Sequence, residues 1–190
     1  MRRAGRNGGF TMIELMVTVA IIGILVGLAA TALTRNPEID GTRQVAAMLS
    51  EARRRAIAAG PMRSDVQAAT GERARIKVDF TNQSGRGLVW VSMAVEDPAP
   101  ATTFQWVDVS GQRLPDKVEI YAVGTSAAVD PGGALPGALG TGVVTRKFYP
   151  DGTAQALTVY VQRSNSSGTH SQHRVFVLPL TATPSTFKGW

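Results

Sequence analysis

The 190-residue sequence contains no cysteine and only two histidines. Without thiols the chain forms neither a disulfide nor a cysteine-based metal or catalytic site, so its stability must come from packing. His170 and His173 have the spacing of paired zinc ligands, but neither a predicted helix nor a nearby carboxylate completes such a site. We interpret the pair as part of a solvated hairpin tip.

Other signatures of an enzyme are also missing. The chain has no Gly-x-Ser-x-Gly turn and no glycine-rich phosphate loop, and its carboxylates are scattered. The basic triplet Arg53–Arg55 lies in a predicted helix, where consecutive side chains point in different directions and do not form one phosphate-binding patch. We therefore expect no catalytic residue, metal or cofactor, and a structural or interaction role.

The longest apolar run, Leu15–Leu33, contains 19 residues without a charge. Together with residues 10–13 it can cross a bilayer core of about 30 Å as a helix. The arginines that precede it, Arg2, Arg3 and Arg6, predict a cytoplasmic N-terminus by the positive-inside rule. We predict a transmembrane helix over 10–33, because the apolar core of a secretory signal peptide is shorter and is followed by its cleavage site.

One carboxylate, Glu14, lies near the start of this apolar segment. An unpaired charge in hydrocarbon costs at least about 2.5 kcal/mol on insertion scales. Glu14 is therefore expected to have a partner of opposite charge and a functional role.

The remainder of the chain is predicted to be one extracytoplasmic domain. An amphipathic helix is expected over 34–60, with its clearest periodicity at Pro37–Ala59 and a stop at Gly60-Pro61. Residues 61–190 should form a β-domain, because apolar residues alternate with polar ones at Ala74–Phe80. Further strands are predicted at Leu88–Val95, Phe104–Val109, Lys117–Tyr121, Val143–Phe148, Ala156–Gln162 and Arg174–Leu178. The stretch Gly124–Gly142, rich in Ala, Gly and Pro, is predicted to be a surface loop.

The N-terminal residues Gly9-Phe10-Thr11-Met12-Ile13-Glu14 resemble the class III leader of type IV pilins and type II secretion pseudopilins. The resemblance implies that residues 1–9 are a leader, which a prepilin peptidase removes after Gly9. It implies methylation of the new N-terminal Phe10, and pairing of Glu14 with the terminal amine of a neighbouring subunit. A buried carboxylate and a buried amine are each costly alone and much less so as a pair.

Two further stretches, Ser50–Ile57 and Lys147–Ala154, resemble the GspH/FimT group of minor pseudopilins and minor pilins. That resemblance implies an α+β, pilin-like fold, in which a long N-terminal helix is followed by an antiparallel β-domain of two facing sheets. It implies an H-like minor pseudopilin of the type II secretion system, inserted in the bacterial inner membrane with a periplasmic domain and incorporated at or near the pseudopilus tip. The implied partners are the prepilin peptidase, other major and minor pseudopilins, and secreted substrate proteins.

The alternative is a minor pilin of a type IV pilus, of the FimT kind, with a role in DNA uptake. DNA-binding members of the group carry a basic Gly-Arg-x-Arg type motif near the C-terminus, but the matching positions here read His173–Pro179 and Thr186–Trp190. Removal of the three leader arginines also lowers the formal charge from +6 to +3. Both observations argue against DNA as a partner.

Overall fold

The computed structural model describes residues 11–33, 36–125, 137–164 and 172–189, and it describes the side chains of all of them except 29–33. The chain divides into two compact units, Met1–Asn36 and Pro37–Trp190. The predicted loop at Gly124–Gly142 falls largely on 126–136, outside the described residues.

In the described part of the first unit, α1 spans Met12–Leu33. It contains no proline and is rich in Ala, Ile and Leu, so its backbone forms an uninterrupted helix. Of the helices in the described part of the chain, none is both long and apolar enough to cross a membrane.

The second unit begins with α2 at Pro37–Ala59, as the periodicity predicted. Pro37 has a backbone suited to a first helical position, and Glu38 and Asp40 lie in the first turn, where they oppose the positive end of the helix dipole. Gly60 ends the helix with a φ of +64°, a conformation that glycine adopts without strain.

A short helix, α3 (Ser64–Thr70), precedes eight antiparallel strands in the described residues. One four-stranded sheet has the order β3-β2-β1-β5 and the other has the order β4-β6-β7-β8. The strands are β1 Ile76–Gln83, β2 Arg86–Glu96, β3 Phe104–Arg113, β4 Val118–Gly124, β5 Val144–Phe148, β6 Leu157–Arg163, β7 Gln172–Val177 and β8 Pro184–Lys188. The α+β, pilin-like class with two antiparallel sheets is therefore confirmed.

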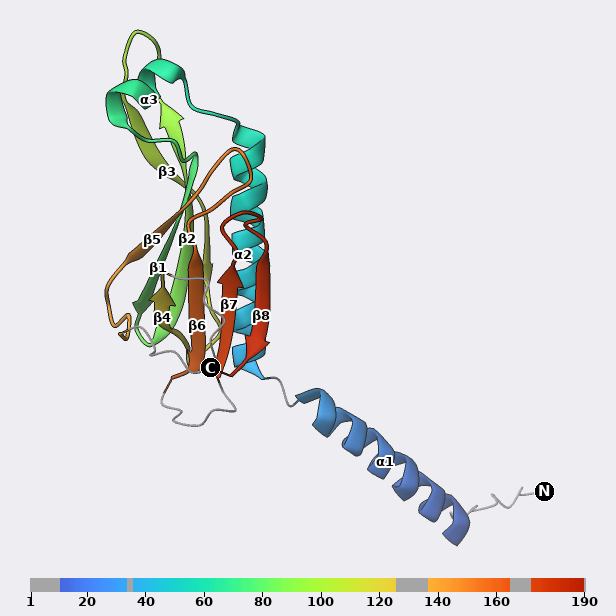
Figure 1. The fold of residues 1–190 in the computed structure, drawn as a ribbon. Helices are drawn as coiled ribbons and strands as arrows, with labels where there is room; N and C mark the ends of the chain where they lie inside the picture. Colours follow the sequence, from blue (N-terminus) through green and yellow to red (C-terminus); the bar gives the residue numbers. More distant parts are fainter. Residues whose placement is uncertain (1–10, 34–35, 126–136, 165–171, 190) are drawn as a thin grey trace, which may run out of the picture. The chain divides into compact units, whose positions relative to one another are not determined.

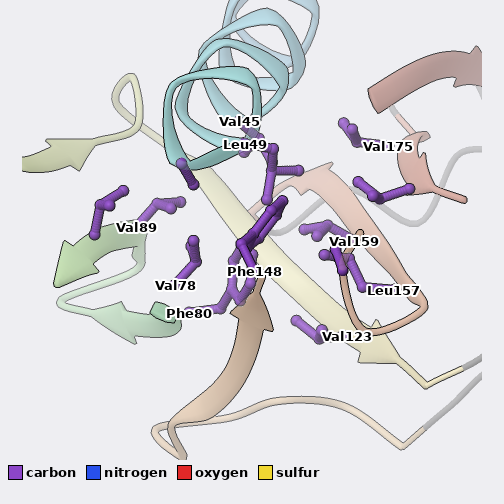
Figure 2. Packing of buried hydrophobic residues seen from close by; sticks show 14 of the residues in the cluster. Val45, Leu49, Val78, Phe80, Val89, Val123, Phe148, Leu157, Val159 and Val175 are labelled. Carbon is purple, nitrogen blue, oxygen red and sulfur yellow. The ribbon is translucent and has the colours of Figure 1, made fainter. Parts of the chain in front are cut away.

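The core of this unit lies between the two sheets and is covered by α2 (Figures 1 and 2). In β1, Ile76, Val78 and Phe80 point inward and their neighbours point outward, as the alternation predicted. Phe148 of β5 reaches the same core, where Figure 2 shows it beneath Leu49 of α2 and beside residues of the second sheet. Among the described residues, those that form the core all belong to Pro37–Trp190, so this unit has the apolar interior of an independent domain.

The prediction for His173 was wrong. His173 lies on β7 and is buried rather than at a solvated tip, whereas His170 lies outside the described residues. Burial lowers the pKa of the His173 imidazole; the charge of Glu38 on α2 opposes this shift and that of Lys188 on β8 adds to it. The structure thus makes His173 part of the contact between α2 and the second sheet.

Candidate functional site

The N-terminal turn of α1 holds the predicted functional carboxylate, Glu14. Its Oε2 accepts hydrogen bonds from the Thr11 backbone N–H at 2.9 Å and from Thr11 Oγ1 at 3.0 Å. The Glu14 backbone N–H donates in return to Thr11 Oγ1 at 3.3 Å. This reciprocal pattern is a capping box, in which residues three apart satisfy the free N–H groups of a helix start.

The capping box fixes the carboxylate at the N-terminal end of α1. Both bonds use Oε2, and within the described residues Oε1 has no hydrogen bond. Sequence reasoning assigned a role to Glu14 but missed Thr11, although the spacing Thr-x-x-Glu was readable as a capping signal. The other two predicted site residues, Gly9 and Phe10, lie outside the described residues, so their roles stay predictions.

The rest of α1 presents an apolar surface on every side. Side chains from Met12 to Leu28 are exposed all round the helix, and the exposed fraction of Met12 is 82%. Gly23 and Gly27 have the spacing of a small-xxx-small pair, and no other described atom lies within 4 Å of a Cβ placed at either position. Such a surface needs lipid or other apolar helices around it.

The side chains of the basic triplet on α2 point in different directions, as the helix geometry predicted. Arg54 and Arg55 both pair with Glu51, each with a nitrogen 2.6 Å from a carboxylate oxygen. Arg53 instead lies beside Gly152 in the turn that follows β5. The three guanidinium groups therefore do not form one anion-binding patch.

The turn at Asp151-Gly152 is confirmed. Asp151 Oδ1 accepts hydrogen bonds from the Thr153 backbone N–H at 2.9 Å and from Thr153 Oγ1 at 2.6 Å, and Gly152 has a φ of +81°. The hydrogen bonds from the Thr153 hydroxyl and backbone N–H are the main reason that the pKa of Asp151 is lowered. The charge of Arg73 makes a smaller contribution. A structural role accounts for these contacts.

Comparison with protein families gave one match, in which residues 5–30 fit the model of the prokaryotic N-terminal methylation motif. Neither the comparison with curated proteins nor that with solved structures gave a match. The matched motif indicates a type IV pilin-like protein with a prepilin leader and N-methylation. It implies processing by a prepilin peptidase, assembly with other pilins, anchoring to the membrane through the N-terminal helix, and a structural rather than a catalytic role.

Proposed function

We propose that this protein is an H-like minor pseudopilin of the type II secretion system. In this proposal the segment 10–33 anchors the protomer in the inner membrane, with the N-terminus cytoplasmic and the domain from Pro37 periplasmic. After cleavage at Gly9 the protomer joins the tip region of the pseudopilus and supports protein secretion. The type IV pilus alternative shares the leader and the fold, and no feature of the described residues favours it.

The observation that carries the proposal is the position of Glu14. It is one carboxylate on an otherwise apolar helix, held at the helix start with one oxygen free. A neighbouring subunit that brought the ammonium of Phe10 to Oε1 would neutralise both charges as they are buried. Because the pair forms only at one axial position, it would set the register between subunits.

Leader processing tests the first step. Coexpression with a prepilin peptidase should shorten the chain by the nine residues of its leader and leave a methylated Phe10. Gly9→Val should block the cleavage. An intact mass that shows a different cut in the native cell would refute this assignment.

Two substitutions at Glu14 separate its charge from its capping role. Glu14→Gln retains an acceptor for the Thr11 N–H and removes only the charge, whereas Glu14→Ala removes both. Both variants should insert and be processed normally, because loss of a charge eases insertion. Both should fail in assembly, because a broken buried pair costs about 3 to 5 kcal/mol.

The quantities to measure are crosslinking to other minor subunits and secretion of a substrate protein, at matched protein levels. Failure of Glu14→Ala alone would assign the defect to the helix cap instead of to the charge. Normal assembly and secretion with both variants would show that Glu14 does not set the register of this subunit.

A further inference from the structure

A cleft of about 460 Å³ opens in the second unit, away from the N-terminal helix in sequence. One side is the segment 61–73, which contains α3, and the other is the segment 147–155, which includes the end of β5 and most of the connection to β6. The segment 61–73 follows directly on the C-terminal end of α2, and Figure 1 shows α3 at that end of the domain. Pockets that bind ligands in proteins have volumes of about 300 to 1,000 Å³.

An ion pair joins the two sides of the cleft. Lys147 Nζ bonds to Glu72 Oε2, while Glu72 Oε1 accepts the backbone N–H groups of Arg73 at 3.0 Å and Ala74 at 2.9 Å. Burial opposes the ionisation of Glu72, but these donors outweigh it and hold the pKa of the carboxyl below its ordinary value. Both Glu72 oxygens are thus used within the fold, and the pair is a fixed wall of the cleft.

Other groups along the cleft keep unused hydrogen-bonding capacity. Within the described residues, neither the exposed guanidinium of Arg73 nor the half-buried hydroxyl of Tyr149 has a hydrogen bond or an ion pair. Gln155 uses its Oε1 to accept the Lys147 N–H at 3.1 Å, which leaves its NH₂ group available. In the part of the chain that the structure describes, Asp151 accepts side-chain hydrogen bonds only at Oδ1, which leaves Oδ2 as an acceptor. Donors and acceptors therefore lie side by side.

The charges of the cleft balance, because Arg73 and Lys147 match Glu72 and Asp151. A nucleic acid binds through an excess of cations on phosphates, and that excess is missing here. Tyr149, Pro150 and Pro61 add apolar surface to the walls. Tyrosine and arginine are enriched at protein interfaces and dominate their binding energy.

We infer that the cleft binds an extended, near-neutral polypeptide segment of a second protein. The backbone of such a segment presents alternating N–H and C=O groups, which match the acceptors and donors of Asp151, Gln155 and Arg73. Its side chains pack against Tyr149. The inference goes beyond the proposed function and is independent of it, because no residue of α1 takes part.

The test uses a phage-displayed library of random dodecapeptides, from which peptides that bind the purified full-length protein in detergent micelles are selected. Enriched peptides are synthesised with a fluorescent label, and their affinity is measured by fluorescence polarisation. Arg73→Ala and Tyr149→Ala should each weaken binding about tenfold or more, as for the central residues of an interface. Arg163→Ala is the matched control, because Arg163 is an exposed arginine at the end of β6, and it should leave the affinity unchanged.

Thermal unfolding of each variant separates lost binding from lost folding. Within the described residues the Arg73 side chain has no hydrogen bond or ion pair, and its charge makes only a minor contribution at Asp151, so Arg73→Ala should melt close to the parent protein. The inference is overturned if the library yields no consensus peptide, or if its binding is unchanged by both cleft substitutions. A result of either kind leaves leader cleavage and the Glu14 experiments unaffected.

Discussion

At Gly41 in α2, helix propensity and side-chain packing predict opposite effects of an alanine substitution on the stability of the domain. Glycine inside a helix is about 1 kcal/mol less favourable than alanine, so propensity alone predicts that Gly41→Ala stabilises the domain. In the structure a Cβ at position 41 would lie 2.7 Å from Val118 Cγ1 and 3.5 Å from Pro115 Cδ. Gly41 therefore marks the place where α2 passes close to the start of β4.

The cost of the contact between a Cβ at position 41 and Val118 decides whether Gly41→Ala stabilises or destabilises the domain. Val118 is fully buried and its β-branched side chain has little rotamer freedom, so it cannot turn away easily. An extra methyl group in a packed core costs about 1 to 3 kcal/mol. After subtraction of the helix gain of about 1 kcal/mol, Gly41→Ala should destabilise the domain by as much as about 2 kcal/mol.

Urea and thermal unfolding of the domain Pro37–Trp190 measure this difference, and 1 kcal/mol corresponds to about 2 to 4 °C in a domain of this size. Ala47→Gly is the control at an exposed position of the same helix, and it measures the free-energy difference between alanine and glycine that comes from helix propensity. In the double variant with Val118→Ala, the new methyl group has room, so the two changes should be coupled by about 0.5 kcal/mol or more. A melting temperature that rises with Gly41→Ala alone would refute the packing argument.

Three further outcomes follow from charged groups. Because the pKa of His173 is lowered in the fold, stability should fall as the pH drops from about 6.5 through the folded pKa, and His173→Gln should remove that part of the pH dependence in thermal melts. Glu96→Gln should lower the free energy of unfolding in urea by about 3 kcal/mol, since Arg75 Nη1 lies 2.6 Å from Glu96 Oε1 and both side chains are largely buried. An unchanged free energy of unfolding would contradict a stabilising role of this ion pair. The domain from Asn36 onward should bind duplex DNA no better than about 10⁻⁴ M at physiological salt, and low-micromolar binding by fluorescence anisotropy would favour the pilus alternative.

Patterns with a strong period were predicted correctly. The helix at Pro37–Ala59 and the strand that contains Ile76, Val78 and Phe80 both have one apolar face, and burial of that face determines their conformation. The sequence alone also draws attention to Glu14, because a charge in an apolar segment is conspicuous wherever the segment packs; its role in assembly stays a prediction. Its hydrogen bonds to Thr11 follow from a local three-residue spacing.

Elements without such a pattern were missed. The strand β8 (Pro184–Lys188) begins with proline and has mostly polar residues, and it is a strand because it pairs with β7, for example at Ser185 and Phe176. The helix α3 is seven residues long and buries only Val66, too little for a periodic signal. Both elements are defined by their neighbours.

The sequence by itself determined the apolar N-terminal helix, its carboxylate and the alternation of the strands, since these depend on residues close together in the chain. The tertiary structure alone decided that His173 is buried, that Gly41 allows α2 to approach Val118, and that a cleft forms at all. The two sides of the cleft, 61–73 and 147–155, are distant in sequence and are brought together by the pairing of β1 with β5 and by the bond between Glu72 and Lys147. Such contacts depend on long-range pairing, which no local period encodes.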